Sequence, residues 1–202
     1  MAKNVVNTLG ASNLSKKERS FLDYYGTDPK TVRALLDAES FEENIWEPGS
    51  GHGNIVNELK AKGYKVWSTD IYDYGHQDAI IDFLEFDGDW QGSIVMNPPY
   101  KLAQEFIEKA LSKLGQGHKL AALLRLQFLE GKKRFTELYK NNPPKKVYVF
   151  VDRQVCSKTD DFTEGSAVAY CWMIWEKGFS GSPTIHWLSA GKEQDIHQIK
   201  AM

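Results

Sequence analysis

The chain has few cysteines, no long apolar run and almost no net charge, and each shortage excludes a class of protein. Cys156 and Cys171 are too few for a disulfide framework and form no cluster with metal-ligand spacing. No apolar run approaches the roughly 20 residues that span a bilayer. The polar stretch 1–13 lacks the apolar core of a signal peptide. We therefore expect a soluble, cytoplasmic protein that does not enter a membrane and needs no metal.

Charge is distributed unevenly along a chain whose formal net charge is −2. The stretch 125–158 contains nine basic and three acidic residues, an excess of six. One interpretation is a solvated, charged surface of helix and loop. The other is a flank that contacts the phosphates of a nucleic acid, which is favoured if a base-modifying site lies nearby. The candidate nucleic-acid contacts are Arg125, Lys132, Lys133, Arg134, Arg153 and Lys158.

Short apolar runs alternate with helical patterns through most of the 202 residues. The expected strands are 44–47, 65–69, 79–82, 93–96, 120–124, 147–150 and 167–175. The expected helices are 54–62, 103–114, a segment that ends at Tyr139, and a short helix that begins at Pro29 with Asp28 as its N-cap. This alternation predicts an α/β fold in which helices cover both faces of a parallel sheet.

A glycine-rich turn, Glu47-Pro48-Gly49-Ser50-Gly51-His52-Gly53, follows the first expected strand. Glycines at such a strand-to-helix turn let the main chain approach a ligand closely. The third glycine of a dinucleotide-binding fingerprint is missing, since Asn54 and Val56 occupy its positions, and the Gly-Lys-Ser/Thr ending of a triphosphate loop is missing too. The remaining alternatives are a different cofactor loop or a plain tight turn.

Acidic residues end three successive expected strands: Glu47, Asp70 and Asp82. Asp70 follows the glycine turn by about 20 residues, where a carboxylate can accept hydrogen bonds from both hydroxyls of a ribose. Each acid alone would be interpreted as a solvated strand end. Their order along the chain instead favours a cofactor that contains a nucleoside.

The tetrad Asn97-Pro98-Pro99-Tyr100 directly follows an apolar strand, at the end of the sheet where open α/β folds bind ligands. The Asn97 side-chain oxygen and the Pro98 carbonyl can accept both N–H bonds of an aromatic amino group, which directs its nitrogen lone pair toward a methyl donor. The prolines donate no competing N–H bond, and Tyr100 offers a face on which a base can stack. The alternative is a proline-stiffened loop with a packing tyrosine.

With these motifs in this order, the chain resembles the phage- and prophage-type DNA N6-adenine methyltransferases over most of its length. The segment 21–29 resembles their N-terminal cofactor motif, except that Asp28 separates Thr27 from Pro29, and the segments 125–131 and 172–175 are also similar to this group. The resemblance implies one Rossmann-like class I methyltransferase domain over residues 1–202. It would have a mostly parallel seven-stranded sheet with an antiparallel final strand, and residues 1–40 would form a cofactor lid.

The resemblance also implies a reaction: methyl transfer from S-adenosyl-L-methionine to the N6 amino group of a flipped adenine in DNA. The catalytic residues would be Asn97, Pro98, Pro99 and Tyr100. The cofactor contacts would be Tyr25, Thr27, Glu47, Pro48, Gly49, Gly51, Gly53, Asp70, Ile71, Asp82, Phe83 and Asn97. Only 102 residues follow Tyr100, so we expect no separate target-recognition domain and a target read by the loops 125–146 and 153–165.

Several alternatives stay open. Methyltransferases that act on the amino groups of RNA adenine or guanine, or on a protein glutamine, share the Asn-Pro-Pro-Tyr tetrad. A non-catalytic subunit could keep the fold. The sequence contains no recognisable RNA-binding module or protein-docking domain, which favours DNA modestly. Neither cysteine lies in the Pro-Cys element of C5-cytosine methyltransferases, and Cys171 is expected in the core. The sequence leaves the oligomeric state open.

Overall fold

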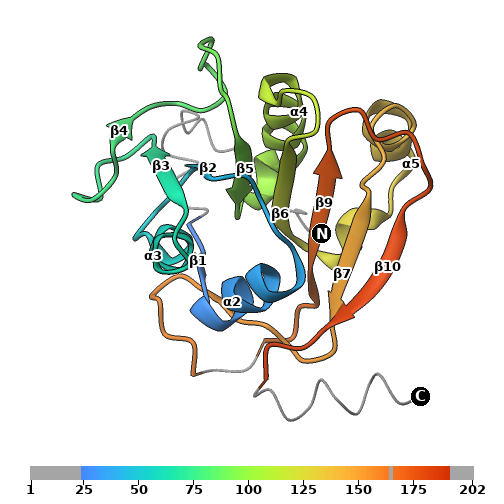
Figure 1. Cartoon of the computed structure of the whole chain (residues 1–202). Helices are drawn as coiled ribbons and strands as arrows, with labels where there is room; N and C mark the ends of the chain where they lie inside the picture. The colour runs from blue at the N-terminus through green and yellow to red at the C-terminus, as the bar shows by residue number, and fades with distance from the viewer. Residues whose placement is uncertain (1–23, 164–165, 192–202) are drawn as a thin grey trace, which may run out of the picture.

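A computed structural model describes residues 24–163 and 166–191 (Figure 1). Its centre is an eight-stranded sheet in the order β10-β7-β9-β6-β5-β2-β3-β4. Strand β9 is antiparallel to both of its neighbours, β6 and β7, and the other paired strands are parallel. In chain order the strands are β2 (Asn44–Pro48), β3 (Lys65–Asp70), β4 (Ala79–Ile80), β5 (Ser93–Met96), β6 (Lys119–Arg125), β7 (Lys146–Phe150), β9 (Tyr170–Glu176) and β10 (Thr184–Leu188).

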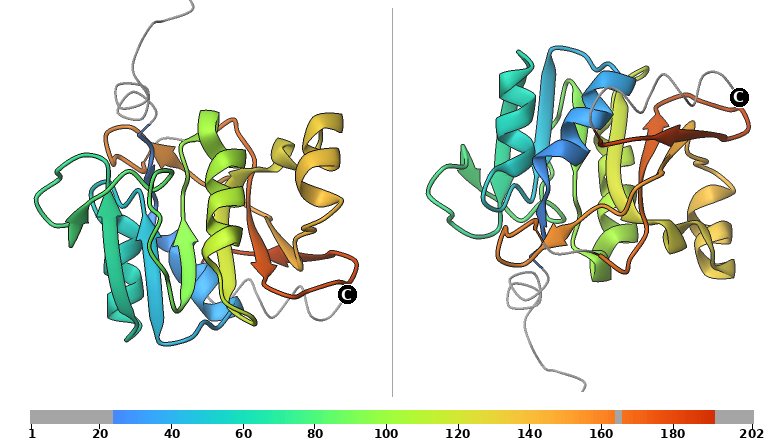
Figure 2. Two further views of the ribbon diagram at one scale, coloured as in Figure 1. Left: turned by 90° about the horizontal axis from the view of Figure 1, so that it is seen from above. Right: turned by 90° about the horizontal axis from the view of Figure 1, so that it is seen from below.

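Helices cover both faces of this sheet (Figures 1 and 2). Helices α2 (Pro29–Ala38) and α3 (Asn54–Ala61) pack on one face, where Leu35 and Leu59 are fully buried in the same apolar cluster. Helix α4 (Ala103–Lys113) and the continuous segment α5 (Lys132–Arg134) and η3 (Phe135–Tyr139) pack on the other, where Ile107 and Leu138 are fully buried. The short 3₁₀ helices η1 (Tyr100–Leu102) and η2 (Leu126–Leu129) follow β5 and β6.

The beginning of α2 is the one that the sequence predicts. Pro29 occupies the first turn, and the Asp28 carboxylate accepts a hydrogen bond of 3.0 Å from the main-chain N–H of Lys30. This bond satisfies one of the N–H groups that the first turn of a helix leaves without a partner.

The α/β fold class, the mostly parallel sheet and the helices on both faces are confirmed. Two details differ from the expectation: the sheet has eight strands instead of seven, and the antiparallel strand β9 is not the last. Strand β10 follows it and pairs in parallel with β7, with Trp187 opposite Val149. Ile185 and Trp187 remain 58% and 66% exposed at this edge. Strand β10 therefore lacks the buried apolar pattern from which the other strands were predicted.

A separate two-stranded sheet was also not predicted. Strand β1 (Gly26–Thr27) pairs antiparallel with β8 (Cys156–Ser157). Two-residue strands leave no periodic pattern in a sequence. The pairing brings the segment before α2 against the loop between β7 and β9, which we call the 151–163 loop.

The cysteines differ in burial. Cys171 is fully buried on β9, as expected, and Cys156 is only half-buried on β8. Within the two described ranges, no His, Cys, Asp or Glu side chains form a group of three that could hold a metal ion. No helix in the described part of the chain is both long and apolar enough to cross a membrane.

Candidate functional site

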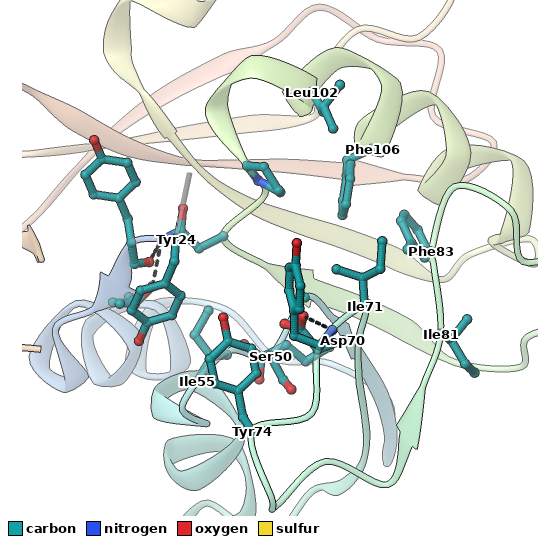
Figure 3. Close-up of a pocket in the computed structure, with 18 of the residues that line it drawn as sticks. Tyr24, Ser50, Ile55, Asp70, Ile71, Tyr74, Ile81, Phe83, Leu102 and Phe106 are labelled. Atoms are coloured by element: carbon teal, nitrogen blue, oxygen red, sulfur yellow. Dashed lines mark hydrogen bonds between the residues drawn. The ribbon is translucent and has the colours of Figure 1, made fainter. Parts of the chain in front are cut away.

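A cleft of about 860 Å³, which we call the main cleft, opens at the carboxyl ends of β2, β3 and β5 (Figure 3). Many residues that the sequence singled out line it: Tyr25, Thr27, Glu47, Gly49, Asp70, Ile71, Asp82, Phe83, Asn97 and Pro99. The predicted cofactor contacts therefore come together from separate segments of the chain. The predicted lid, residues 1–40, can be placed only from Tyr24 onward, because residues 1–23 lie outside the described part of the chain.

Sequence reasoning missed other lining residues: Tyr24, Gly26, Ser50, Asn54, Ile55, Tyr72, Tyr74, Ile81, Leu84, Leu102 and Phe106. Two pairs of these residues could have been found from the sequence. Asn54 and Ile55 form the first turn of the helix after the glycine turn, and Leu102 and Phe106 are four residues apart at the beginning of α4. The aromatic residues Tyr24, Tyr72 and Tyr74 lie in irregular segments, whose course no periodicity predicts.

The two sides of the main cleft differ in polarity. Ile71, Phe83, Leu102 and Phe106 form an apolar side, and Ser50, Asp70 and Tyr74 lie on the opposite side (Figure 3). Phe83 is almost fully buried, with its ring 5.2 Å from that of Phe106, so it forms the floor of the apolar side. Such a cleft suits a ligand with an apolar ring at one end and polar groups at the other.

The glycine turn is held against the end of β3. The main-chain N–H groups of Gly49 and Ser50 both donate to the Thr69 carbonyl, and that of Gly51 donates to the Asp70 carboxylate over 2.9 Å. Gly49, Gly51 and Gly53 have φ values of 87°, 50° and 83°, which favour glycine. Pro48, Gly51 and Gly53 do not line the main cleft. Pro48 ends β2, and the two glycines shape the turn.

Two buried carboxyl groups face the main cleft. Burial raises the pKa of Glu47 well above its ordinary value, and the nearby Asp70 adds to the rise. Burial also raises the pKa of Asp70, although N–H bonds from Tyr72 and Gly51 lower it in part. Among the described residues, neither Glu47 Oε2 nor the Ser50 hydroxyl has a hydrogen-bond partner. Buried polar atoms without partners are costly, so these groups suit a ligand that donates hydrogen bonds.

Asp82 lines the main cleft next to Phe83 in the sequence. It follows the short strand β4, and its carboxylate accepts a 3.0 Å hydrogen bond from the main-chain N–H of Leu84. The bond holds the turn that carries Phe83, so Asp82 and the ring are positioned together beside Ile71.

Asn97 has a fixed amide orientation. Its Nδ2 group donates to the Tyr25 carbonyl over 2.9 Å and to the Thr27 hydroxyl over 3.0 Å, which uses both amide hydrogens. The Oδ1 atom is buried and has no partner in the described structure. The wall of the main cleft therefore holds an acceptor whose direction is set by the segment before α2.

Tyr100 does not line the main cleft. It lines a second cavity of about 870 Å³, whose other lining residues include Arg125, Phe128, Lys133 and Arg134. Its ring centroid is 5.2 Å from that of Tyr25, and burial raises the pKa of its hydroxyl. Pro98 is buried and lines neither cavity, whereas Pro99 lines the main cleft. Residues of the tetrad thus border both cavities.

The basic stretch is less positive than its composition indicates. Lys145 and Lys146 form ion pairs with Glu176 and Glu39. The Arg134 guanidinium stacks 4.0 Å from the Phe128 ring and donates to the Phe128 carbonyl over 2.8 Å, so it holds the turn after β6.

The other candidate contacts remain on the surface. Arg125, Lys132, Lys133, Arg153 and Lys158 are exposed. Lys133 makes only a 3.8 Å surface pair with Glu137, and the Lys158 amine lies 5.2 Å from the Tyr25 ring centroid. Of the six candidate contacts, these five have side chains that solvent, and therefore a phosphate, can reach.

Neither a protein-family profile nor a curated protein matches the sequence. Solved structures share its fold. A candidate class I S-adenosylmethionine-dependent methyltransferase from Listeria monocytogenes superposes with a TM-score of 0.61 at 14% identity, over 89% of this chain and 71% of that one. A candidate RNA methyltransferase from Pyrococcus horikoshii gives 0.56 at 14% identity, over 82% and 100%.

A modification subunit of a candidate type I restriction enzyme from Vibrio vulnificus gives a TM-score of 0.60 at 13% identity, over 84% of this chain. The match spans 48% of that subunit, about half of its length. The chain has the fold of class I methyltransferases. Identities this low show the fold alone, so the roles of individual residues must be argued from their geometry.

Proposed function

We propose that this protein transfers a methyl group from S-adenosyl-L-methionine to the N6 amino group of adenine in DNA. The observation that carries the proposal is the Asn97 side chain. Both of its amide hydrogens are used by Tyr25 and Thr27, and its oxygen is left as a buried acceptor beside the main cleft. A buried oxygen held in this way is suited to bind an amino group of a substrate.

The residues of the main cleft fit the cofactor. Asp70 can accept the ribose hydroxyls, because each carboxylate oxygen accepts more than the one main-chain N–H bond that it already has. Ile71, Phe83 and Phe106 offer an apolar slot for the adenine ring, and Asp82 lines the same cleft. The unpartnered oxygens of Glu47 and Ser50 suit the cationic amino group of the methionine part. When bound, the cofactor supplies a methyl group on a positively charged sulfur.

The role of Asn97 follows from the chemistry of its substrate. An exocyclic amino nitrogen shares its lone pair with the adenine ring and is therefore a poor nucleophile. A hydrogen bond to Asn97 Oδ1 would favour a tetrahedral nitrogen whose lone pair points at the methyl group. Transfer would form an N–CH₃ bond as the methyl–sulfur bond breaks, with the neutral thioether as leaving group and the surplus proton of the nitrogen released to solvent. It needs chiefly correct positioning. Tyr100, next to the second cavity, would stack on the flipped base.

Several observations favour a nucleic acid as the carrier of the amino group. The second cavity adjoins Arg125 and Lys133, and further exposed basic side chains lie nearby in sequence. Structural neighbours include a modification subunit of a candidate restriction enzyme and a candidate RNA methyltransferase. We favour DNA because the sequence resembles the phage-type adenine enzymes, and we keep RNA as the alternative.

The test is to incubate the protein with methyl-labelled cofactor and separate pools of DNA, RNA and protein. Nuclease digestion and mass spectrometry should identify N6-methyladenine from DNA. Asn97→Ala should lower kcat by about 10²–10³-fold, the loss seen when one donor that stabilises a transition state is removed. Calorimetry should find its affinity for the cofactor nearly unchanged, because Glu47 and Asp70 remain.

Each alternative has a distinct outcome. Label in RNA or on protein glutamine would assign a different substrate to the same site. Cofactor binding without transfer to any pool would indicate a non-catalytic subunit. Full activity of Asn97→Ala would show that the buried oxygen has no part in the reaction.

A further inference from the structure

The carboxylate of Asp160, in the 151–163 loop, is the centre of a group of side chains from three segments. It accepts hydrogen bonds from the Tyr24 hydroxyl, over 2.8 and 3.0 Å, and from the Asn54 amide over 2.9 Å, and it pairs with His52 Nδ1. We call Asp160, Tyr24, His52 and Asn54 the Asp160 cluster. Tyr24 precedes β1, His52 belongs to the glycine turn, and Asn54 is the first residue of α3.

Glycines on both sides make room for this cluster. A side chain at Gly26 would collide with the Asp160 carboxylate, and one at Gly51 would collide with the Tyr24 ring. Asp160 itself has a φ of 55°, a left-handed conformation that most residues avoid but that Asp tolerates. The main chain on three segments is therefore shaped to let one carboxylate approach them.

Two of the residues that Asp160 holds line the main cleft, namely Tyr24 and Asn54. Burial and the bond to Asp160 raise the pKa of the Tyr24 hydroxyl, so it stays protonated and donates. The ring of Tyr24 also lies 6.0 Å from that of Tyr74, another residue of the cleft wall. The polar side of the main cleft thus has its shape set by a residue outside it.

Tyr24 and Asn54 together form what we call the outer wall of the main cleft. We propose that Asp160 is a positioning residue that holds this outer wall closed over the bound cofactor. The identity of that ligand rests on the proposed function. Asp160 is not required merely to tether its loop. The loop is already attached by the pairing of β8 with β1 and by a 3.0 Å bond from the Thr31 hydroxyl to Gln154. Its carboxylate contributes what these attachments do not, a fixed position for Tyr24 and Asn54.

The test compares Asp160→Ala with Asp161→Ala. Asp161→Ala is the matched control, because it removes the same charge from the next residue of the loop. The exposed Asp161 carboxylate bonds only to Thr163 among the described residues. Calorimetry and stopped-flow displacement would measure S-adenosyl-L-methionine affinity and dissociation rate. Asp160→Ala should weaken affinity and speed dissociation by about tenfold, the size of one lost hydrogen bond to a charged group. Asp161→Ala should stay within about twofold of the parent.

Tyr24→Phe separates positioning from general stability. It removes the hydroxyl that donates to Asp160 and keeps the ring against Gly51. If Asp160 acts mainly through Tyr24, the double variant Tyr24→Phe with Asp160→Ala should bind the cofactor little worse than Asp160→Ala alone. Fully additive losses would overturn the assignment to Tyr24, and equal dissociation rates for Asp160→Ala and Asp161→Ala would overturn the positioning role.

Hydrogen exchange on the ligand-free protein distinguishes failure of this inference from failure of the proposed function. Asp160→Ala should lose protection at 24–27 and 154–163, and Asp161→Ala should not. If the parent protein binds no S-adenosyl-L-methionine, the cofactor assignment is wrong, and the exchange pattern still decides whether Asp160 holds the wall. Unchanged exchange in Asp160→Ala would contradict the inference whatever the ligand is.

Discussion

The guanidinium carbon of Arg125 lies 4.6 Å from the centroid of the Tyr100 ring. Arg125 ends β6 and is exposed, whereas Tyr100 begins η1 and is half-buried. A cation therefore occupies one face of the aromatic ring on which, in the proposed function, the flipped base stacks. Cations over tyrosine rings contribute only about 0.5–1 kcal/mol at exposed sites, so a base that stacks more strongly can displace this one.

Tyr100→Ala should weaken capture of the target base. Stacking on an aromatic side chain contributes about 1–3 kcal/mol per base, so KM for DNA should rise by roughly 5- to 150-fold. Tyr100→Phe keeps the ring face and removes only a buried hydroxyl next to Cys156 and Tyr170, so its KM should stay near the parent value. Steady-state kinetics would measure both. An equal loss in the two variants would mean that the hydroxyl, and not the ring, is required.

Asp70→Ala should weaken S-adenosyl-L-methionine binding by about 1.5–3 kcal/mol, or roughly 10- to 150-fold, because it removes the charged acceptor proposed for the ribose. It should also loosen the glycine turn, because Gly51 loses its acceptor. Asp70→Asn is the matched control: it keeps one oxygen for a main-chain N–H bond but no charge. Calorimetry beside thermal melting separates the two effects. Unchanged affinity in both variants would remove Asp70 from the cofactor site.

Glu47→Gln should stabilise the ligand-free protein near pH 7. The pKa of Glu47 is raised on folding, so its ionisation opposes folding once the pH exceeds about 4.3, the ordinary value for glutamate. The gain should shrink as the pH falls below about 4.3, because the carboxyl is then protonated increasingly in the unfolded state as well as in the folded state. Thermal melts from pH 4 to 8 would measure it. Glu43→Gln, at an exposed ion pair, should give no such pH-dependent gain.

The same Glu47→Gln variant should bind S-adenosyl-L-methionine more weakly, by about tenfold or more, if Glu47 receives the cationic amino group. Opposite signs for stability and affinity are the diagnostic result. If the variant is less stable than the parent and binds the cofactor with the parent's affinity, Glu47 is a structural residue of the turn.

Lys132→Ala with Lys133→Ala should weaken DNA binding and reduce its dependence on salt. Each lost phosphate contact lowers the slope of log K against log salt by about 0.9. Arg134 is left intact because it holds the turn at Phe128. The control is Lys62→Ala with Lys65→Ala, which removes the same charge. These two residues lie between the end of α3 and the first residue of β3, at the end of the strands opposite the main cleft. Equal slopes for the two double variants would make the basic stretch an ordinary solvated surface.

The elements that the sequence predicts well are those whose burial repeats at a regular spacing. Strand β5 is buried throughout and carries the apolar run Ile94–Met96, and Asp28 with Pro29 begins α2 as expected. Strand β10 was missed because Ile185 and Trp187 face outward on an edge, where no burial pattern forms.

For the candidate site, local motifs predicted Glu47 and Asp70, which lie at the carboxyl ends of β2 and β3, and Asn97, which directly follows β5. Tyr24, Asn54 and Asp160 were not predicted, because their contacts depend on how distant loops meet. Composition alone could not distinguish Lys132, which is exposed, from Lys146, which is paired with Glu39, because that difference depends on a partner far away in the sequence.

The bonds between Tyr24 and Asp160 join residues 136 positions apart. During synthesis the strands from β2 to β6 emerge first, and contacts between such distant segments form slowly because a long loop must close. The outer wall of the main cleft is therefore the last part of the site that a ribosome can complete. We expect a nascent chain that ends before β8 to be unable to retain the cofactor, which delays the onset of methyl transfer until the 151–163 loop has been made.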